Sequence, residues 1–146
     1  MYNNIMNLGI INDWFSVKIK KIGFEDVKIA VQRPNQYVII NTLPVTEQEF
    51  LIKNTIDIFL EEKKINEIME NYLFKQYKII IYGKNSTDES IEKKYHQLNG
   101  LGFNELYIYY GGLFEWMLLQ DIYGENEFPT TSKLIDILKY RPMIVF

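Results

Sequence analysis

Two short, almost wholly apolar runs constrain this chain more than any other feature. Tyr37–Ile40 (YVII) and Lys78–Tyr82 (KIIIY) are rich in β-branched and aromatic residues and lack the polar alternation of a strand that faces water. Such runs are typical of strands buried on both faces of a parallel sheet. Between them, residues 62–73 carry the apolar spacing of an amphipathic helix, and parallel strands need a crossover of this kind. The sequence therefore predicts an α/β fold.

The remaining elements continue the alternation of strands and helices. We expect further strands at 17–22, 56–60 and 106–110. Further helices are expected to end near residue 32, to span about 90–99 and 113–122, and to run from a cap at 130–132 through residue 139. This order predicts a small, mostly parallel sheet with helices on both faces. Without a Pro/Gly/Ser-rich linker or a repeat, we expect a lead-in at 1–12 and one domain over 13–146.

Composition excludes several classes of protein. The net charge of −3 argues against a nucleic-acid partner, and no apolar run approaches the roughly 20 residues that span a bilayer. Residues 1–8 lack the pattern of a secretory signal, so we expect a soluble intracellular protein. Abundant Ile, Asn, Lys and Tyr beside a single alanine, Ala30, indicate an AT-rich microbial or large-virus genome.

In parallel sheets the functional site lies at the carboxyl ends of the strands, so the loops after Ile40 and Tyr82 are the places to examine. There the sequence reads IIIYGKNSTDES at 79–90, followed by LGFNELYIYYGGLFEW at 101–116. These segments resemble the rhodanese (sulfurtransferase) family. In that family a strand ends in Tyr-Cys, a phosphate-binding-like loop opens a helix, and a later strand ends in Gly-Gly with a tryptophan beyond it. Gly111, Gly112 and Trp116 carry the best part of the resemblance.

The departures from the family pattern concern the chemistry. Gly83 stands where the resemblance implies the catalytic cysteine, and the chain contains no cysteine anywhere. Asn41 and Leu43 replace an Asp-x-Arg pair, while Asp88 and Glu89 occupy the region of an expected basic residue. Sulfur transfer needs a thiolate that accepts sulfur as a persulfide, and glycine offers no atom for this. The resemblance therefore implies a rhodanese-like domain that is catalytically inactive.

The degenerate active-site loop leaves two interpretations open. Its residues are Gly83, Lys84, Asn85, Ser86, Thr87, Asp88, Glu89 and Ser90. In the favoured interpretation, a side chain from 86–88 caps the following helix and closes the loop from within. In the other, the loop N–H groups form a cup that binds a small anion.

The aromatic residues near this loop also have alternative roles. We expect Trp116 in the core, while Tyr109 and Tyr110 are either buried or exposed for recognition of a protein partner. Phe128 either pins its polar loop to the core, as we favour, or is a docking residue. His96, the only histidine, is expected to be structural, and no residue spacing indicates a metal site or a cofactor.

Two functions follow from these features. The first is a non-catalytic rhodanese-like domain that acts as a protein-interaction or structural module. The second is an enzyme whose repurposed loop binds or hydrolyses a small phospho- or sulfo-group. The first requires an exposed apolar patch near Tyr109 and Tyr110, whereas the second requires an open polar pocket at Gly83–Ser90.

Overall fold

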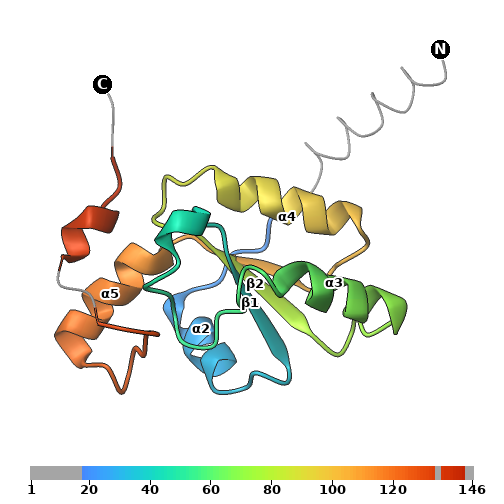
Figure 1. Ribbon diagram of the computed structural model, residues 1–146, viewed down its shortest axis with the longest axis horizontal. Coiled ribbons are helices and arrows are strands. Elements are labelled where there is room, and N and C mark those ends of the chain that lie inside the picture. Colours follow the sequence, from blue (N-terminus) through green and yellow to red (C-terminus); the bar gives the residue numbers. More distant parts are fainter. Residues whose placement is uncertain (1–17, 134–135, 144–146) are drawn as a thin grey trace, which may run out of the picture.

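A three-stranded parallel sheet forms the centre of the computed structural model, which describes residues 18–133 and 136–143 (Figure 1). The strands are β1 (Tyr37–Asn41), β2 (Lys78–Tyr82) and β3 (Leu106–Tyr109), in the spatial order β1-β2-β3. The register aligns Asn41 with Tyr82 and Tyr82 with Tyr109. The carboxyl ends of all three strands therefore meet at one edge of the sheet.

Helices cover both faces of this sheet. The α-helices are α2 (Phe24–Val31), α3 (Glu61–Glu70), α4 (Ser90–Gly100) and α5 (Gly112–Tyr123), and the 3₁₀ helices are η1 (Val45–Glu47) and η2 (Ile137–Tyr140). Alternate strand residues point to opposite faces. Ile80 accordingly lies in one buried cluster with residues of α2 and α5, while Ile79 and Ile81 lie in a second cluster with residues of α3 and α4. The predicted α/β fold, with a small parallel sheet between two helical layers, is confirmed.

Two of the five expected strands are not formed as predicted. Within the expected strand 17–22, of which residue 17 lies outside the described residues, only an isolated parallel bridge joins Lys21 to Ile108. The expected strand at 56–60 is a turn into α3. Asp57 determines this turn, because its Oδ1 accepts from Phe59 N at 2.8 Å and its carbonyl accepts from Leu60 N at 2.9 Å.

The expected helix from 130–132 through residue 139 is also wrong in its described part. Thr130 forms an antiparallel bridge with Ile52, and Thr131 N donates to Leu51 O at 2.9 Å, so this segment is held extended. Only η2 is helical, and residues 134–135 lie outside the described residues. The predicted lead-in at 1–12 lies outside them as well. Within the ranges that are described, no helix has the length and apolar character needed to cross a membrane.

Candidate functional site

The loop after β2 lies at the carboxyl edge of the sheet, between β1 and the first turns of α4 and α5. Thr42 N donates to Tyr82 O at 3.0 Å, and Ser90 Oγ lies within hydrogen-bond distance of Thr42 Oγ1 at 2.8 Å. On the other side, Leu113 N donates to Gly83 O at 3.0 Å. The structure thus brings together the loops that follow β1 and β2, where a site is expected in a parallel sheet.

The Asp88 carboxylate accepts hydrogen bonds from N–H groups of its own loop. Its Oδ2 accepts from Lys84 N at 3.1 Å, and its Oδ1 accepts from Ser90 N at 3.0 Å and also from the Ser90 hydroxyl. A carboxylate beside the first N–H groups of a helix is also favoured by the helix dipole. Of the three caps that the sequence leaves open, Asp88 is therefore the one that bonds to the start of α4.

Asn85 closes the middle of the loop and holds a distant segment. Its Oδ1 accepts from Thr87 N at 3.0 Å and from Thr87 Oγ1 at 2.7 Å. Its Nδ2 donates to the carbonyls of Tyr140 and Arg141 at 3.1 and 3.3 Å. A buried amide with both ends engaged has no bond left for a ligand. Asn85 therefore anchors the residues around η2 against the loop.

The space above Gly83 is filled. A Cβ atom on Gly83 would lie 2.5 Å from Asp88 Oδ2, 2.8 Å from Ile91 Cγ1 and 2.9 Å from Thr42 Oγ1. These separations are shorter than van der Waals contact, so a side chain enters only if its neighbours move. Where the resemblance implies a cysteine, the structure has a carboxylate instead.

The Gly111-Gly112 pair allows α5 to approach this loop closely. Gly112 has a φ of +66°, and a Cβ there would lie 2.6 Å from Gly83 O. Only glycine adopts this conformation at little cost and leaves room for the carbonyl. The N–H groups of Leu113 and Phe114 then donate to the carbonyls of Gly83 and Lys84, each at 3.0 Å. These two donors of α5 are therefore used by the loop itself.

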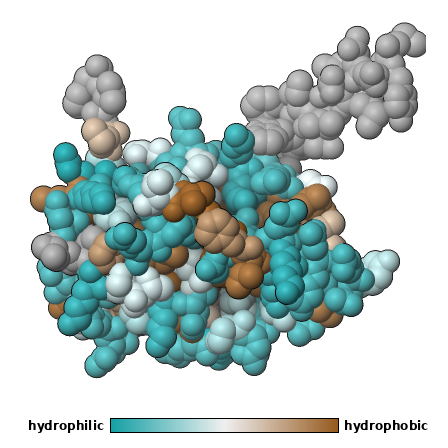
Figure 2. Space-filling model, in the orientation of Figure 1, coloured by the Kyte–Doolittle hydropathy of each residue, from teal (hydrophilic) through white to brown (hydrophobic). Residues whose placement is uncertain are grey.

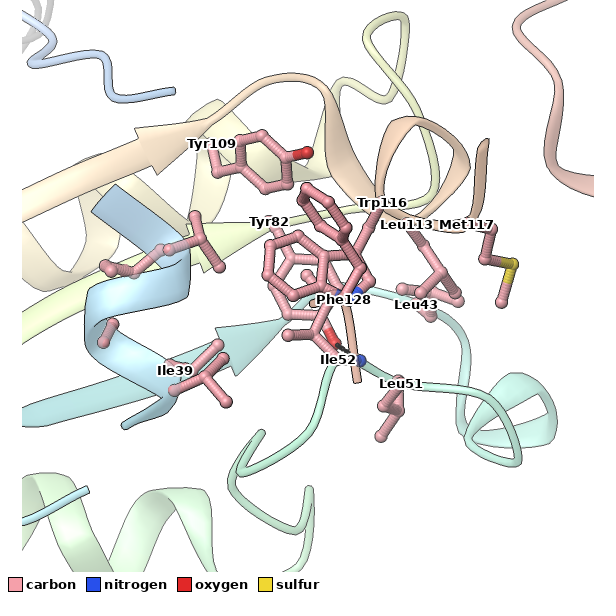
Figure 3. Packing of buried hydrophobic residues seen from close by; sticks show 14 of the residues in the cluster. Ile39, Leu43, Leu51, Ile52, Tyr82, Tyr109, Leu113, Trp116, Met117 and Phe128 are labelled. Atoms are coloured by element: carbon pink, nitrogen blue, oxygen red, sulfur yellow. Dashed lines mark hydrogen bonds between the residues drawn. The ribbon is translucent and has the colours of Figure 1, made fainter. Parts of the chain in front are cut away.

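Trp116 lies in the core, as the sequence predicts. Its ring is fully buried, with its edge against Phe128 at a centroid distance of 5.0 Å and against Tyr109 at 6.3 Å (Figure 3). Its Nε1 donates to Pro129 O at 3.0 Å. Phe128 is buried too, so it pins its loop to the core and is not a docking residue.

The tyrosine that ends β3 and the one that follows it differ in burial. Tyr109 is only 1% exposed, and its hydroxyl donates to Glu115 Oε1 at 2.7 Å. Burial, with the Glu115 carboxylate second, raises the pKa of the Tyr109 hydroxyl well above its ordinary value. Tyr110 is half-buried and donates to Glu92 Oε1 at 2.6 Å. Of the two alternatives that the sequence leaves open for Tyr109, the structure shows burial, while a recognition role for Tyr110 stays a prediction.

Asn41 and Leu43 have structural positions beside the site. Asn41 is buried, and its Oδ1 accepts from Leu43 N at 3.1 Å and from Gln48 Nε2 at 2.8 Å. Leu43 is buried in the core. These residues therefore shape the turn after β1 and offer no charge to a ligand. The sequence analysis did not identify Gln48. Its side-chain amide both donates to and accepts from that of Asn41, and no local sequence pattern predicts this pairing.

A hollow of about 430 Å³ lies beside the loop. Its cationic lining residues are Lys84, Lys139 and Arg141, and its anionic ones are Glu47 and Asp88. Lys84 Nζ lies 3.4 Å from Glu47 Oε1, which offsets part of its charge. The sequence analysis did not place the side chains of Lys139 and Arg141 at this hollow. Their position depends on the hydrogen bonds from Asn85 to the carbonyls of Tyr140 and Arg141, which are distant in sequence.

The described residues show no cluster of metal-binding side chains. They contain no group of three or more His, Cys, Asp or Glu side chains that could hold a metal ion. His96 lies within α4, with its ring edge-on to that of Tyr95 at a centroid distance of 6.1 Å. This contact agrees with the structural role that the sequence predicts for His96.

Comparisons with known proteins concern the fold. No family model and no curated protein sequence matches the chain. A structure of Saccharomyces cerevisiae Ygr203w, a homolog of single-domain rhodanese and the Cdc25 phosphatase catalytic domain, matches with a TM-score of 0.56 and 16% identity, covering 82% of this chain and 91% of that one. A second Ygr203w structure, described as a yeast protein tyrosine phosphatase of the Rhodanese family, gives 0.55 and 16%, with 82% and 96% covered.

The S. cerevisiae single-domain sulfurtransferase RDL2 matches with a TM-score of 0.49 and 19% identity, over 70% of this chain and 92% of that one. Sequence identities this low do not show a shared activity. The two Ygr203w structures show that this chain has the rhodanese-like fold. Its own sequence, which has no cysteine, provides no thiol nucleophile for that fold.

Proposed function

We propose that this chain is a non-catalytic rhodanese-like domain that acts as a protein-interaction or structural module. The observation that carries the proposal is the position of Asp88, whose carboxylate lies 2.5 Å from where a Cβ of residue 83 would stand. The same carboxylate accepts from the N–H groups of Lys84 and Ser90. The loop therefore lacks a thiol and the space for one at residue 83, and part of its N–H donors are occupied from within.

The nucleophile that rhodanese-like enzymes use gives the physical reason for the proposed lack of catalysis. A persulfide or thiophosphate intermediate requires a thiolate, whose pKa is lowered by nearby N–H groups and cations. In this chain those N–H groups face Asp88, and Lys84 lies beside Glu47. A carboxylate at this position would repel thiosulfate or a phosphate ester.

Turnover assays test the proposal directly. The purified chain is incubated with thiosulfate and cyanide, with mercaptopyruvate and with p-nitrophenyl phosphate, beside a cysteine-containing rhodanese as a positive control. We expect rates equal to those in buffer alone. Turnover by the wild-type chain that disappears in an Asp88→Ala variant would contradict a non-catalytic role.

One observation favours the alternative, in which the loop region binds a small anion and acts on it. The hollow beside the loop is lined by three cationic side chains against two carboxylates. Inorganic sulfate is the simplest probe of this alternative. A saturable effect of sulfate that depends on Lys84 would favour it over the interaction module.

A further inference from the structure

Three apolar side chains project into solvent from η1 and from the turn that precedes α3. Val45 is 63% exposed, Phe59 79% and Leu60 54%. In Figure 2, brown residues gather in the middle of the visible face, over these two elements. None of the three belongs to either buried cluster. Val45 lies between Pro44 and Glu47, which line the hollow beside the degenerate loop, so we name only Phe59 and Leu60 the apolar patch.

The backbone holds the patch in this exposed position. The bonds from Phe59 N and Leu60 N to Asp57 fix the turn, and Lys94 Nζ lies 2.7 Å from Glu61 Oε2, which ties the start of α3 to α4. An ordered, exposed phenylalanine contributes little to folding. Exposed aromatic residues held in place are characteristic of surfaces that bind proteins.

The apolar patch continues into an acidic surface. A hollow of about 590 Å³ is lined by Phe59 and by five side chains of α3, namely Glu62, Lys63, Asn66, Glu67 and Glu70. Lys64 Nζ lies 3.7 Å from Glu67 Oε1 and offsets part of that charge, so Glu62 and Glu70 are the carboxylates that give the hollow its acidic character beside Lys63. A guanidinium or ammonium group is attracted both by the face of the Phe59 ring and by the negative charge of these carboxylates.

We propose that the apolar patch and the adjoining face of α3 form a docking surface for a partner segment that carries Lys or Arg next to a large apolar residue. The apolar residue covers Phe59 and Leu60, and the cation lies over the hollow between Glu62 and Glu70. Charge complementarity favours a basic segment, because an acidic one would meet the like charges of Glu62 and Glu70. The inference rests on the proposed interaction function and deepens it.

This surface is separate from the degenerate active-site loop. The hollow on α3 and the hollow beside Gly83–Ser90 have no lining residue in common. Failure of the docking proposal is therefore distinguishable from failure of the proposed function, because the first is read from binding at α3 and the second from turnover.

Selection from a random peptide library tests the proposal without a known partner. Phage-displayed peptides are selected on the wild-type chain, and the composition of the enriched peptides is compared with that of the library. We expect enrichment of Lys or Arg adjacent to Leu, Phe or Trp. Enrichment of acidic or uncharged peptides, or no enrichment, would overturn the proposal.

Variants then locate the binding surface. The best peptide is labelled, and its affinity is measured by fluorescence anisotropy. Phe59→Ala and the double variant Glu62→Gln/Glu70→Gln should each weaken binding about tenfold or more, as expected at a central contact. Raising NaCl from about 50 to about 500 mM should also weaken it, because the charges are exposed.

Ile122→Ala is the matched control, because Ile122 is a 70% exposed apolar residue on α5, against the opposite face of the sheet. It should leave the affinity unchanged. Equal unfolding midpoints in urea verify that all variants are folded. If Phe59→Ala binds the peptide as tightly as wild type, or if Ile122→Ala weakens binding as strongly, the docking surface is not on α3.

Discussion

Replacing Gly112 with alanine perturbs the contact that brings α5 against the degenerate loop. The residue has a φ of +66°, which favours glycine, and the added Cβ would lie 2.6 Å from Gly83 O. That oxygen cannot retreat freely, because it accepts from Leu113 N at 3.0 Å. The substitution therefore strains the backbone and forces apart two segments that are joined by hydrogen bonds.

The magnitude follows from these two costs. An L-residue in the left-handed region loses about 1–2 kcal/mol. Overpacking, including the weakened bond from Leu113 to Gly83, adds about 1–3 kcal/mol. We therefore expect Gly112→Ala to lower the free energy of unfolding by about 2–5 kcal/mol.

Urea unfolding followed by circular dichroism measures the loss, and Gly102→Ala provides the matched control. Gly102 has a φ of +102°, but the nearest atom to its Cβ would be Phe74 Cε1 at 3.9 Å, an ordinary contact. This variant should lose only the backbone term, about 1–3 kcal/mol at this φ. If Gly112→Ala loses no more than Gly102→Ala, the close approach of α5 to the loop is not as described.

Three further predictions concern the core, the loop and pH. Trp116→Ala should cost about 3–5 kcal/mol in urea unfolding, because the ring is fully buried and its Nε1 bonds to Pro129 O; a loss below about 1 kcal/mol would indicate an exposed ring. Gly83→Cys should not produce efficient sulfur transfer, and its thiol should react only at higher pH than free cysteine, because Asp88 disfavours the thiolate; a strongly lowered thiol pKa would contradict the loop geometry. Burial raises the pKa of the Tyr82 hydroxyl, so its contribution to the free energy of unfolding should be complete below about pH 10 and fall above it by about 1.4 kcal/mol per pH unit. Tyr82→Phe should remove this contribution to the slope; an unchanged slope in the variant would show that Tyr82 does not contribute to it.

Local pattern accounts for the elements that sequence reasoning placed correctly. β1 and β2 are continuous apolar runs, and α3 and α4 repeat apolar residues with helical spacing, so each signal lies within the element itself. The loop at Gly83 was located by the same reasoning, because the strand before it marks the carboxyl edge of the sheet. Its closure from within was the favoured interpretation.

The errors come from residues whose surroundings decide their structure. Residues 56–60 read as a strand because they are mostly apolar, yet Asp57 turns the chain and leaves Phe59 and Leu60 in solvent. The residues around η2 are held against the loop because Asn85 bonds to the carbonyl of Tyr140, which is 55 residues away. No local pattern encodes a contact of that kind, so sequence reasoning could not anticipate it.

The response of the melting temperature to sulfate tests most directly whether the degenerate loop is closed. A ligand that binds only the folded state raises the melting temperature in a saturable way. With Asp88 and Asn85 occupying the loop donors, sulfate at about 1–20 mM should stabilise the wild-type chain no more than chloride at equal ionic strength. A selective, saturable rise that Lys84→Ala abolishes would contradict a closed, non-catalytic loop.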